Sequence, residues 1–282
     1  MAPSSSHLLT SARAAQLLGV TPATVKRWAD AGLLACVRTS GGHRRFEPDD
    51  VARFLAGRRA AEPAAAEPWA DRILGAADVP ALVRLLLEER ARLGAWWLVA
   101  GVLGEAVRAI GERWVAGRLT VADEHAASDR LLRALARCGE ELPPRPGAPR
   151  VLLASADGDD HTLGLALAEL VLREWGWPTV WAGRAASADE LVRAIATRRA
   201  EVVALSASLA SRPGALAEEL ERVVPALRAA GMPLLAGGDG PWPEPLPWGV
   251  RIQDFGALRT FLHAEDARRG ASARPVVRHG ES

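Results

Sequence analysis

"VLLASADGDDHTLGLALAEL", residues 151–170, decides the fold of the second half of the chain. An uncharged apolar run is followed by a polar turn and then by a stretch with the apolar spacing of a helix. The same alternation returns four times, with apolar runs at 179–181, 202–205, 233–236 and 249–252. Short buried strands that alternate with helices are typical of a parallel sheet covered on both faces. We therefore predict an α/β doubly wound domain, flavodoxin-like or Rossmann-like, over residues 149–268.

Polar residues and glycines follow three of these predicted strands. They are Asp159, His161 and Gly164 after the first strand, Ser206 after the third, and Gly237 and Gly238 after the fourth. Ligands bind at the carboxyl ends of the strands in such sheets. A neutral imidazole can offer one ring nitrogen to a metal while a nearby carboxylate accepts the other ring N–H, and His161 and Asp159 have that spacing. Gly164 would leave room for a bulky group, and the remaining three residues would line a slot.

The first 58 residues predict a winged-helix domain. Thr10 or Ser11 can cap a short helix that ends at Leu18, Gly19 lies in the turn, and Thr21 can cap a second helix that has proline at its first position. The stretch "LLACVRTSGGHRRF", residues 33–46, has two glycines between short extended runs, which is typical of a hairpin. A last short helix is expected to begin near Pro48.

This head is basic and the rest of the chain is acidic. Residues 1–60 hold nine Lys and Arg against four Asp and Glu, which leaves 26 against 30 for the remainder. A basic module of this kind fits a polyanion, and duplex DNA is the natural one for a helix-turn-helix. The candidate DNA-binding residues are Thr24, Lys26 and Arg27 on the second helix and Arg38, His43, Arg44 and Arg45 on the wing.

The middle of the chain predicts helices between two breaks. "GRRAAEPAAAEPWA", residues 57–70, has no apolar stripe and two Glu-Pro steps, so we expect a linker at 59–70. Residues 71–142 have helical spacing without a strand pattern and predict a four-helix bundle. The proline-rich stretch 142–150 ends the bundle, and residues 269–282 are expected to form a flexible tail.

The length of 282 residues and the 49% hydrophobic content suit a multi-domain protein. The longest uncharged apolar stretch, 93–104, is too short to cross a bilayer, and the first residues lack the pattern of a secretion signal. Cys36 and Cys138 form no paired motif. We expect a cytoplasmic protein without disulfides or a membrane span.

Two resemblances join these observations. Residues 8–56, with their "GGHRRF" wing, resemble the winged-helix domain of the MerR family, which implies binding to pseudo-palindromic DNA as a dimer. The order Asp-x-His-x-x-Gly, Ser, Gly-Gly resembles the cobalamin-binding domain of methionine synthase and related corrinoid proteins. That resemblance implies that His161 is the lower axial ligand of cobalt, that Asp159 orients it, and that Ser206, Gly237 and Gly238 hold the nucleotide tail. Ser208 departs from the leucine that is frequent two places after the serine.

A tryptophan followed by a Glu-His pair in the bundle resembles the light-responsive, B12-binding regulators called CarH or LitR. In that family the bundle caps the upper cobalamin face and the tryptophan contacts the 5′-deoxyadenosyl group. The matching positions are Trp114, Val121, Glu124 and His125. The resemblance implies adenosylcobalamin as cofactor, with methylcobalamin or hydroxocobalamin as alternatives, and tetramers on operator DNA that separate in light. RNA polymerase is a further candidate partner. Light-sensing members have a histidine after the tryptophan that binds cobalt after photolysis, whereas this chain has Val115.

Three other hypotheses follow from the same residues. A phospho-receiver domain has a similar fold and an acidic pair, but this chain has Ser206 in place of the phosphorylated aspartate and its one lysine, Lys26, lies in the head. A regulator that senses B12 or redox state without light is favoured by Val115. A corrinoid enzyme or methyl carrier would not need a DNA-binding head and would need a substrate domain. The sequence therefore predicts a regulator and not an enzyme.

Overall fold

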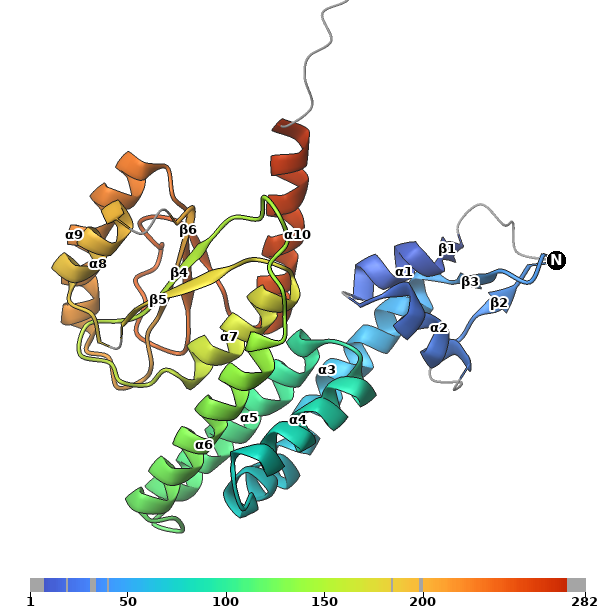
Figure 1. Cartoon of the computed structure of the whole chain (residues 1–282), viewed down its shortest axis with the longest axis horizontal. Coiled ribbons are helices and arrows are strands. Elements are labelled where there is room, and N and C mark those ends of the chain that lie inside the picture. The colour runs from blue at the N-terminus through green and yellow to red at the C-terminus, as the bar shows by residue number, and fades with distance from the viewer. Residues whose placement is uncertain are drawn as a thin grey trace, which may run out of the picture. The chain divides into compact units, whose positions relative to one another are not determined.

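The computed structural model describes residues 8–18, 20–30, 34–39, 41–183, 185–197 and 200–272 (Figure 1). The chain divides into two compact units, 1–135 and 136–282. Within the described residues, no helix is both long enough and apolar enough to cross a membrane. Gly19, expected in the first turn, and residues 273–282 of the expected tail lie outside the described residues. Cys36 and Cys138 are both free thiols.

The first unit begins with the predicted winged helix-turn-helix. Its elements are α1 (Ser11–Leu18), α2 (Pro22–Asp30), β2 (Val37–Arg38) and β3 (Arg44–Phe46), and a short strand β1 (Leu9–Thr10) joins β3 on the side away from β2. Thr10 caps α1, because its Oγ1 accepts the N–H of Arg13 at 3.1 Å. Thr21 caps α2 in the same way through the N–H of Thr24 at 3.2 Å. Both predicted helices therefore begin at polar caps.

The prediction of a short third helix followed by a linker is wrong. The structure has one continuous helix, α3 (Pro48–Gly75), through the stretch that was assigned to the linker. The alanines of that stretch have the highest helix propensity of any residue and favour this helix, although the two prolines oppose it. Its second half is also held by packing: Ala66, Trp69, Ala70 and Ile73 are buried, which is the i, i+3, i+4, i+7 spacing of one helix face. The predicted boundary at residue 70 cut through this stripe.

The four-helix bundle is confirmed, with the end of α3 as its first member. The other three helices are α4 (Val79–Leu93), α5 (Trp96–Val115) and α6 (Val121–Glu140). α3 packs along α5, whose first five residues and whose inward face are buried. The guanidinium of Arg130 on α6 donates to the carbonyl oxygen of Leu74 at the end of α3, at 3.2 Å. α6 runs from the first unit into the second.

The second unit contains the predicted parallel sheet. Its strands are β4 (Val151–Ser155), β5 (Thr179–Gly183), β6 (Val202–Ser206), β7 (Leu234–Gly237) and β8 (Val250–Arg251). They lie in the order β5-β4-β6-β7-β8 and all pairs are parallel. All five coincide with predicted apolar runs to within two residues. From β4 the next strand, β5, is added on one side, and β6 to β8 are added on the other. The strand order therefore changes direction between β4 and β6, and ligands bind beside the loops that follow these strands in such folds.

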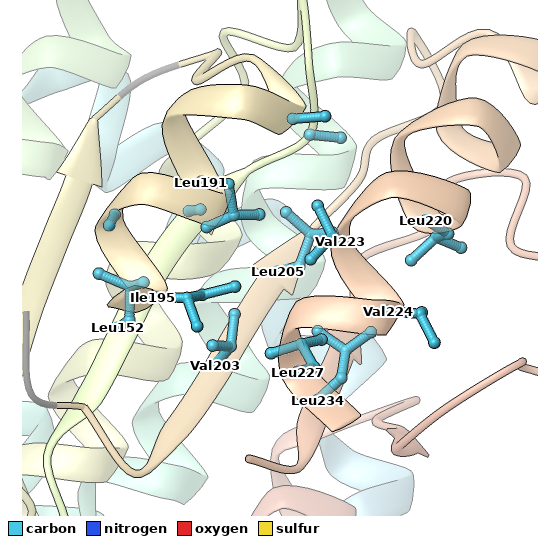
Figure 2. Packing of buried hydrophobic residues seen from close by; sticks show 14 of the residues in the cluster. Leu152, Leu191, Ile195, Val203, Leu205, Leu220, Val223, Val224, Leu227 and Leu234 are labelled. Atoms are coloured by element: carbon cyan, nitrogen blue, oxygen red, sulfur yellow. The ribbon is translucent and has the colours of Figure 1, made fainter. Parts of the chain in front are cut away.

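Helices cover both faces of the sheet (Figure 1). On one face lie α8 (Ala188–Thr197) and α9 (Pro213–Ala230), and on the other lie α7 (Leu163–Glu174) and α10 (Phe255–Ser272). Figure 2 shows Leu191 and Ile195 of α8 and Val223 and Leu227 of α9 packed over the side chains of the central strands. The expected flexible tail from residue 269 is corrected in part, because α10 continues to Ser272.

Candidate functional site

The loop between β4 and α7, residues 156–162, begins with a tight turn that positions the predicted His161. The N–H of Asp159 donates to the carbonyl oxygen of Ala156 at 2.9 Å, and Gly158 between them has a φ of 75°, which favours glycine. The N–H of Ala156 in turn donates to the carbonyl oxygen of Ser206 at 2.8 Å. The loop is therefore fixed to β6 at its base and folded back at Gly158.

The predicted pair of Asp159 and His161 is brought together by this turn. Oδ1 of Asp159 accepts the backbone N–H of His161 and lies 2.9 Å from the ring Nδ1 of the same residue. The side chain of Asp159 is fully buried, whereas the side chain of His161 is 68% exposed. Since Nδ1 faces the carboxylate, Nε2 is the ring nitrogen that remains for a metal.

The other oxygen of Asp159 is held by two serines that are not among the predicted cofactor-binding residues. Oδ2 accepts the N–H of Ser208 and the hydroxyl of Ser211, both at 2.6 Å. Burial alone would raise the pKa of Asp159, but the donors from Ser211, Ser208 and His161 outweigh it and lower the pKa to about 2. Asp159 is thus ionised at neutral pH and favours an N–H on the Nδ1 of His161. The loop after β6 contributes to the site through its backbone and a hydroxyl.

The four other predicted residues lie at the same edge of the sheet. Gly164 is the second residue of α7, and a Cβ there would have no atom within 4 Å, so the helix start is open above it. Ser206 aligns with Gly237 in neighbouring strands. Gly238 has a φ of 79°, and a Cβ there would lie 2.3 Å from the carbonyl oxygen of Ala207. Gly238 is therefore required for close approach to the loop after β6.

The predicted cap residues gather at one end of the bundle. Trp114 and Val115 end α5, and Val121 begins α6 after a turn through Gly117, whose φ is 69°. These three large apolar side chains are 47%, 78% and 51% exposed, respectively. Glu124 accepts the hydroxyl of Ser128 at 2.6 Å, and its other oxygen lies 3.6 Å from Nε2 of His125. The bundle end thus presents an apolar surface edged by one acid and one imidazole.

The basic residues of the head surround a hollow of about 320 Å³ between the helix starts and the wing. Lys26, His43, Arg44 and Arg45 contribute to its lining, together with Thr10, Ser11, Ala12, Pro22 and Gly42. Lys26, Arg27, Arg38 and His43 are exposed, as expected of residues that contact DNA. Arg44 is ion-paired with Asp30 at the end of α2, and Arg38 lies 3.4 Å from the same carboxylate. This pairing ties the wing to the second helix.

Thr24, predicted to contact DNA, does not lie on the exposed face of α2, and its assignment is corrected. It is buried with Val25 and Trp28 on the inward side of α2, and its hydroxyl lies 3.0 Å from Oγ1 of Thr21. A Cβ at Gly94, which ends α4 with a φ of 91°, would lie 2.3 Å from the methyl group of Thr24. Thr24 therefore packs against the turn between α4 and α5. The capping pattern of α2 was recognised, but the face on which its third residue falls was not.

Family models match the head and the helical bundle, and one relative matches most of the chain. Residues 8–59 match the family described as "Helix-turn-helix domain", and residues 72–138 match "B12 binding domain". The HTH-type transcriptional repressor CarH of Myxococcus xanthus is 30% identical over 264 residues, which cover 80% of this chain and 87% of CarH. The chain belongs to the CarH/CarA family of HTH-type transcriptional repressors.

A second relative and a solved structure extend the comparison. The repressor CarA of the same organism is 33% identical over 187 residues, covering 64% of this chain and 62% of CarA. Both relatives are repressors rather than enzymes, as the sequence predicts for this chain. The monomethylamine corrinoid protein of Methanosarcina barkeri aligns over 72% of this chain and all of its own length, with a TM-score of 0.51 at 16% identity. This likeness confirms the succession of helical bundle and α/β domain.

Proposed function

We propose that this CarH/CarA-family chain is a cytoplasmic transcriptional repressor that binds operator DNA through its head and is controlled by adenosylcobalamin. The observation that carries the proposal is the pair of Asp159 and His161. A buried, ionised carboxylate holds Nδ1 of an exposed imidazole at 2.9 Å, which leaves Nε2 for cobalt. A histidine with only a structural role would more often be buried and satisfied at both nitrogens.

The residues at the sheet edge fit a cobalamin. His161 would supply the lower ligand, the open start of α7 at Gly164 would accept the corrin edge, and Ser206, Gly237 and Gly238 would lie beside the nucleotide tail. Trp114, Val121, Glu124 and His125 of the bundle would contact the upper face. Trp114 and Val121 are 47% and 51% exposed although they are large apolar side chains, and this favours a bound group there. Bound adenosylcobalamin supplies a cobalt–carbon bond that light can break.

The proposed regulation is a shift between two states of the bundle. A ligand can favour one conformation only by as much as it binds that conformation more tightly. In this chain the ligand would contact Trp114 and Val121 on either side of the α5–α6 turn, so filling or emptying the cap changes what α5 and α6 pack against. We propose that the filled state forms a homotetramer that holds operator DNA.

The cofactor assignment is tested by adding adenosylcobalamin to the purified apoprotein in darkness. We expect a red chromophore bound at one per chain, and a His161→Ala variant that lacks the histidine-ligated spectrum. Asp160→Asn is the matched control, because Asp160 is exposed beside the histidine. A wild-type protein that stays colourless, or a variant with the wild-type spectrum, would contradict the proposal.

Light response is tested by the mass of the cobalamin-loaded protein in the dark and after green illumination. We expect a tetramer that separates into smaller species and releases operator DNA.

Val115 favours a second candidate, a repressor that senses the B12 level or the redox state without light. By the family resemblance it replaces the histidine that would be the second cobalt ligand, and its side chain, which is 78% exposed, cannot ligate. Identical mass and identical operator binding before and after light would select this second candidate.

A further inference from the structure

Glu219 is a buried acid on the inward face of α9. It lies between Leu216 and Leu220 in the apolar stripe of that helix, and only 2% of its surface is exposed. Figure 2 shows the neighbouring side chains of this stripe, Leu220 and Val223, in the core beside the strands. An ionisable group at such a position is costly to bury unless it has a partner. The contacts of the Glu219 carboxyl group therefore show what it does in the fold.

One oxygen of Glu219 contacts the turn that carries the site. Oε2 accepts the N–H of Asp157 at 3.0 Å. Asp157 is the second residue of the 156–159 turn, so its N–H is not used by the hydrogen bond that closes the turn. Oε1 is buried and, among the residues that the structure describes, has no hydrogen-bond partner. Glu219 thus accepts a donor of the turn that the turn itself leaves unused.

Two acids therefore hold the turn, one from outside it and one from within it. Glu219 reaches into it from α9, and Asp159 reaches out of it to Ser208 and Ser211. The second acid also holds the ring of His161. A movement of the turn at Asp157 would therefore reach Asp159, two residues along the chain, and through Asp159 the imidazole. No part of this chain of contacts requires Glu219 to touch a ligand.

We propose that Glu219 is a positioning residue for His161, which fixes the 156–159 turn from the helix side and thereby fixes the imidazole for cobalt. The inference rests on the proposed function of His161. Below about pH 7 the acid of Glu219 is mostly neutral, which is the form that an apolar core tolerates. Burial raises its pKa to about 7, the N–H of Asp157 opposes this effect, and the negative charge of Asp157 adds to it. Asp157 is the charged group that acts on Glu219 from the turn.

A consequence is that ligation by His161 becomes sensitive to pH near neutrality. The ionised Glu219 would leave a negative charge in an apolar core with one oxygen unpaired, and this state is relieved by opening the turn to water. Above the pKa, the imidazole is then held less firmly. Asp159 does not produce such a change, because it stays ionised over the whole range.

The test compares three variants. Glu219→Leu removes the acceptor at nearly constant volume, Glu219→Gln keeps an acceptor but cannot ionise, and Glu218→Gln makes the same charge change at the exposed neighbouring position. Two readouts are used: hydrogen exchange of the Asp157 amide in the apoprotein at fixed pH, and the visible spectrum of the loaded protein from pH 5.5 to 8.5. The first readout does not involve the cofactor.

We expect the Asp157 amide of Glu219→Leu to exchange about tenfold faster, as for the loss of one hydrogen bond. Its histidine-ligated spectrum should be weaker at every pH. The wild type and Glu218→Gln should lose part of this spectrum as the pH rises through about 7, whereas Glu219→Gln should show no such step. Should the leucine variant fail to fold, the glutamine variant decides the matter alone.

The inference is overturned if the leucine variant exchanges and ligates like the wild type, or if the glutamine variant keeps the pH step. A failure of the proposed function is distinct from both results. In that case the wild-type protein binds no cobalamin or shows the spectrum of His161→Ala, whatever the residue at position 219.

Discussion

Nη1 of Arg113 on α5 lies 2.7 Å from a carboxylate oxygen of Asp71 on α3, and Nη2 of the same guanidinium is paired with Glu67 one turn earlier. Both carboxylates raise the pKa of Arg113, the Glu67 bond more than the Asp71 bond. Arg113 directly precedes Trp114 in α5. The helix that continues from the DNA-binding head is therefore joined by charge to the residue beside the proposed cofactor cap.

Replacing Arg113 tests how much its two ion pairs contribute to the stability of the apoprotein. The carboxylates are 62% and 70% exposed, so solvent screens the pairs, and we expect Arg113→Met to lower the free energy of unfolding by about 1 kcal/mol. The loss should shrink in high salt. Urea denaturation of the apoprotein measures it. Arg108→Met is the control and should have a smaller effect, because the side chain of Arg108 is 52% exposed, against 17% for Arg113, and is paired with one carboxylate, that of Glu105, instead of two. An equal loss in Arg113→Met and Arg108→Met would show that the second ion pair of Arg113 adds no stability.

Trp69 tests the corrected boundary between head and bundle. It is 2% exposed in a stretch whose sequence predicts a linker. Because the side chain packs in the bundle, Trp69→Ala should lower the free energy of unfolding by about 3 to 5 kcal/mol. The half-exposed Trp114 is the control, and Trp114→Ala should cost much less in the apoprotein. A linker at 59–70 would instead give a small loss for Trp69→Ala.

The sheet could be predicted from the sequence because strands buried on both faces appear as uninterrupted apolar runs. The course of α3 could not be predicted in this way. Its local signals, Pro63 and Pro68 after glutamates, favour a break, and the packing against α5 that overrides them is a contact between distant segments. Ser211 and Glu219 were missed for a related reason. Each contacts the 156–159 turn only because β4 and β6 are neighbours and α9 covers them. A glutamate within the apolar stripe of a predicted helix was the one local signal.

Asp159 should make the stability of the apoprotein depend on acid pH. Its folded-state pKa of about 2 is below the ordinary value of 3.8, so its contribution is present above the ordinary value and is lost as the pH falls through about 2. We expect Asp159→Asn to cost about 2 kcal/mol at pH 7 and less at pH 3. Denaturation at both values measures this difference. The exposed Asp160→Asn should show no such trend. A loss that is the same at both pH values would mean that the charge of Asp159 is not stabilised.

Glu219 should produce the opposite dependence. Its folded-state pKa of about 7 is above the ordinary value of 4.5, so stability is greatest below 4.5 and falls as the pH rises through about 7. The decline attributable to this group should be about 3 kcal/mol at most. Glu219→Gln cannot ionise and should lack this decline. The difference between the unfolding free energies of the two proteins, measured from pH 5 to 8, isolates it. Parallel curves for the two proteins would contradict the raised pKa.

Thr24 and Lys26 lie two residues apart on α2 and differ in exposure. Lys26 is exposed beside the hollow of the wing, whereas Thr24 is buried and bonded to the Thr21 cap. Lys26→Ala should weaken operator binding and reduce the slope of log affinity against log salt by about one, as for the loss of one phosphate contact. Thr24→Ala should leave that slope unchanged and lower the free energy of unfolding by about 1 kcal/mol. An unchanged salt slope in Lys26→Ala would place the phosphate contact elsewhere on the basic surface.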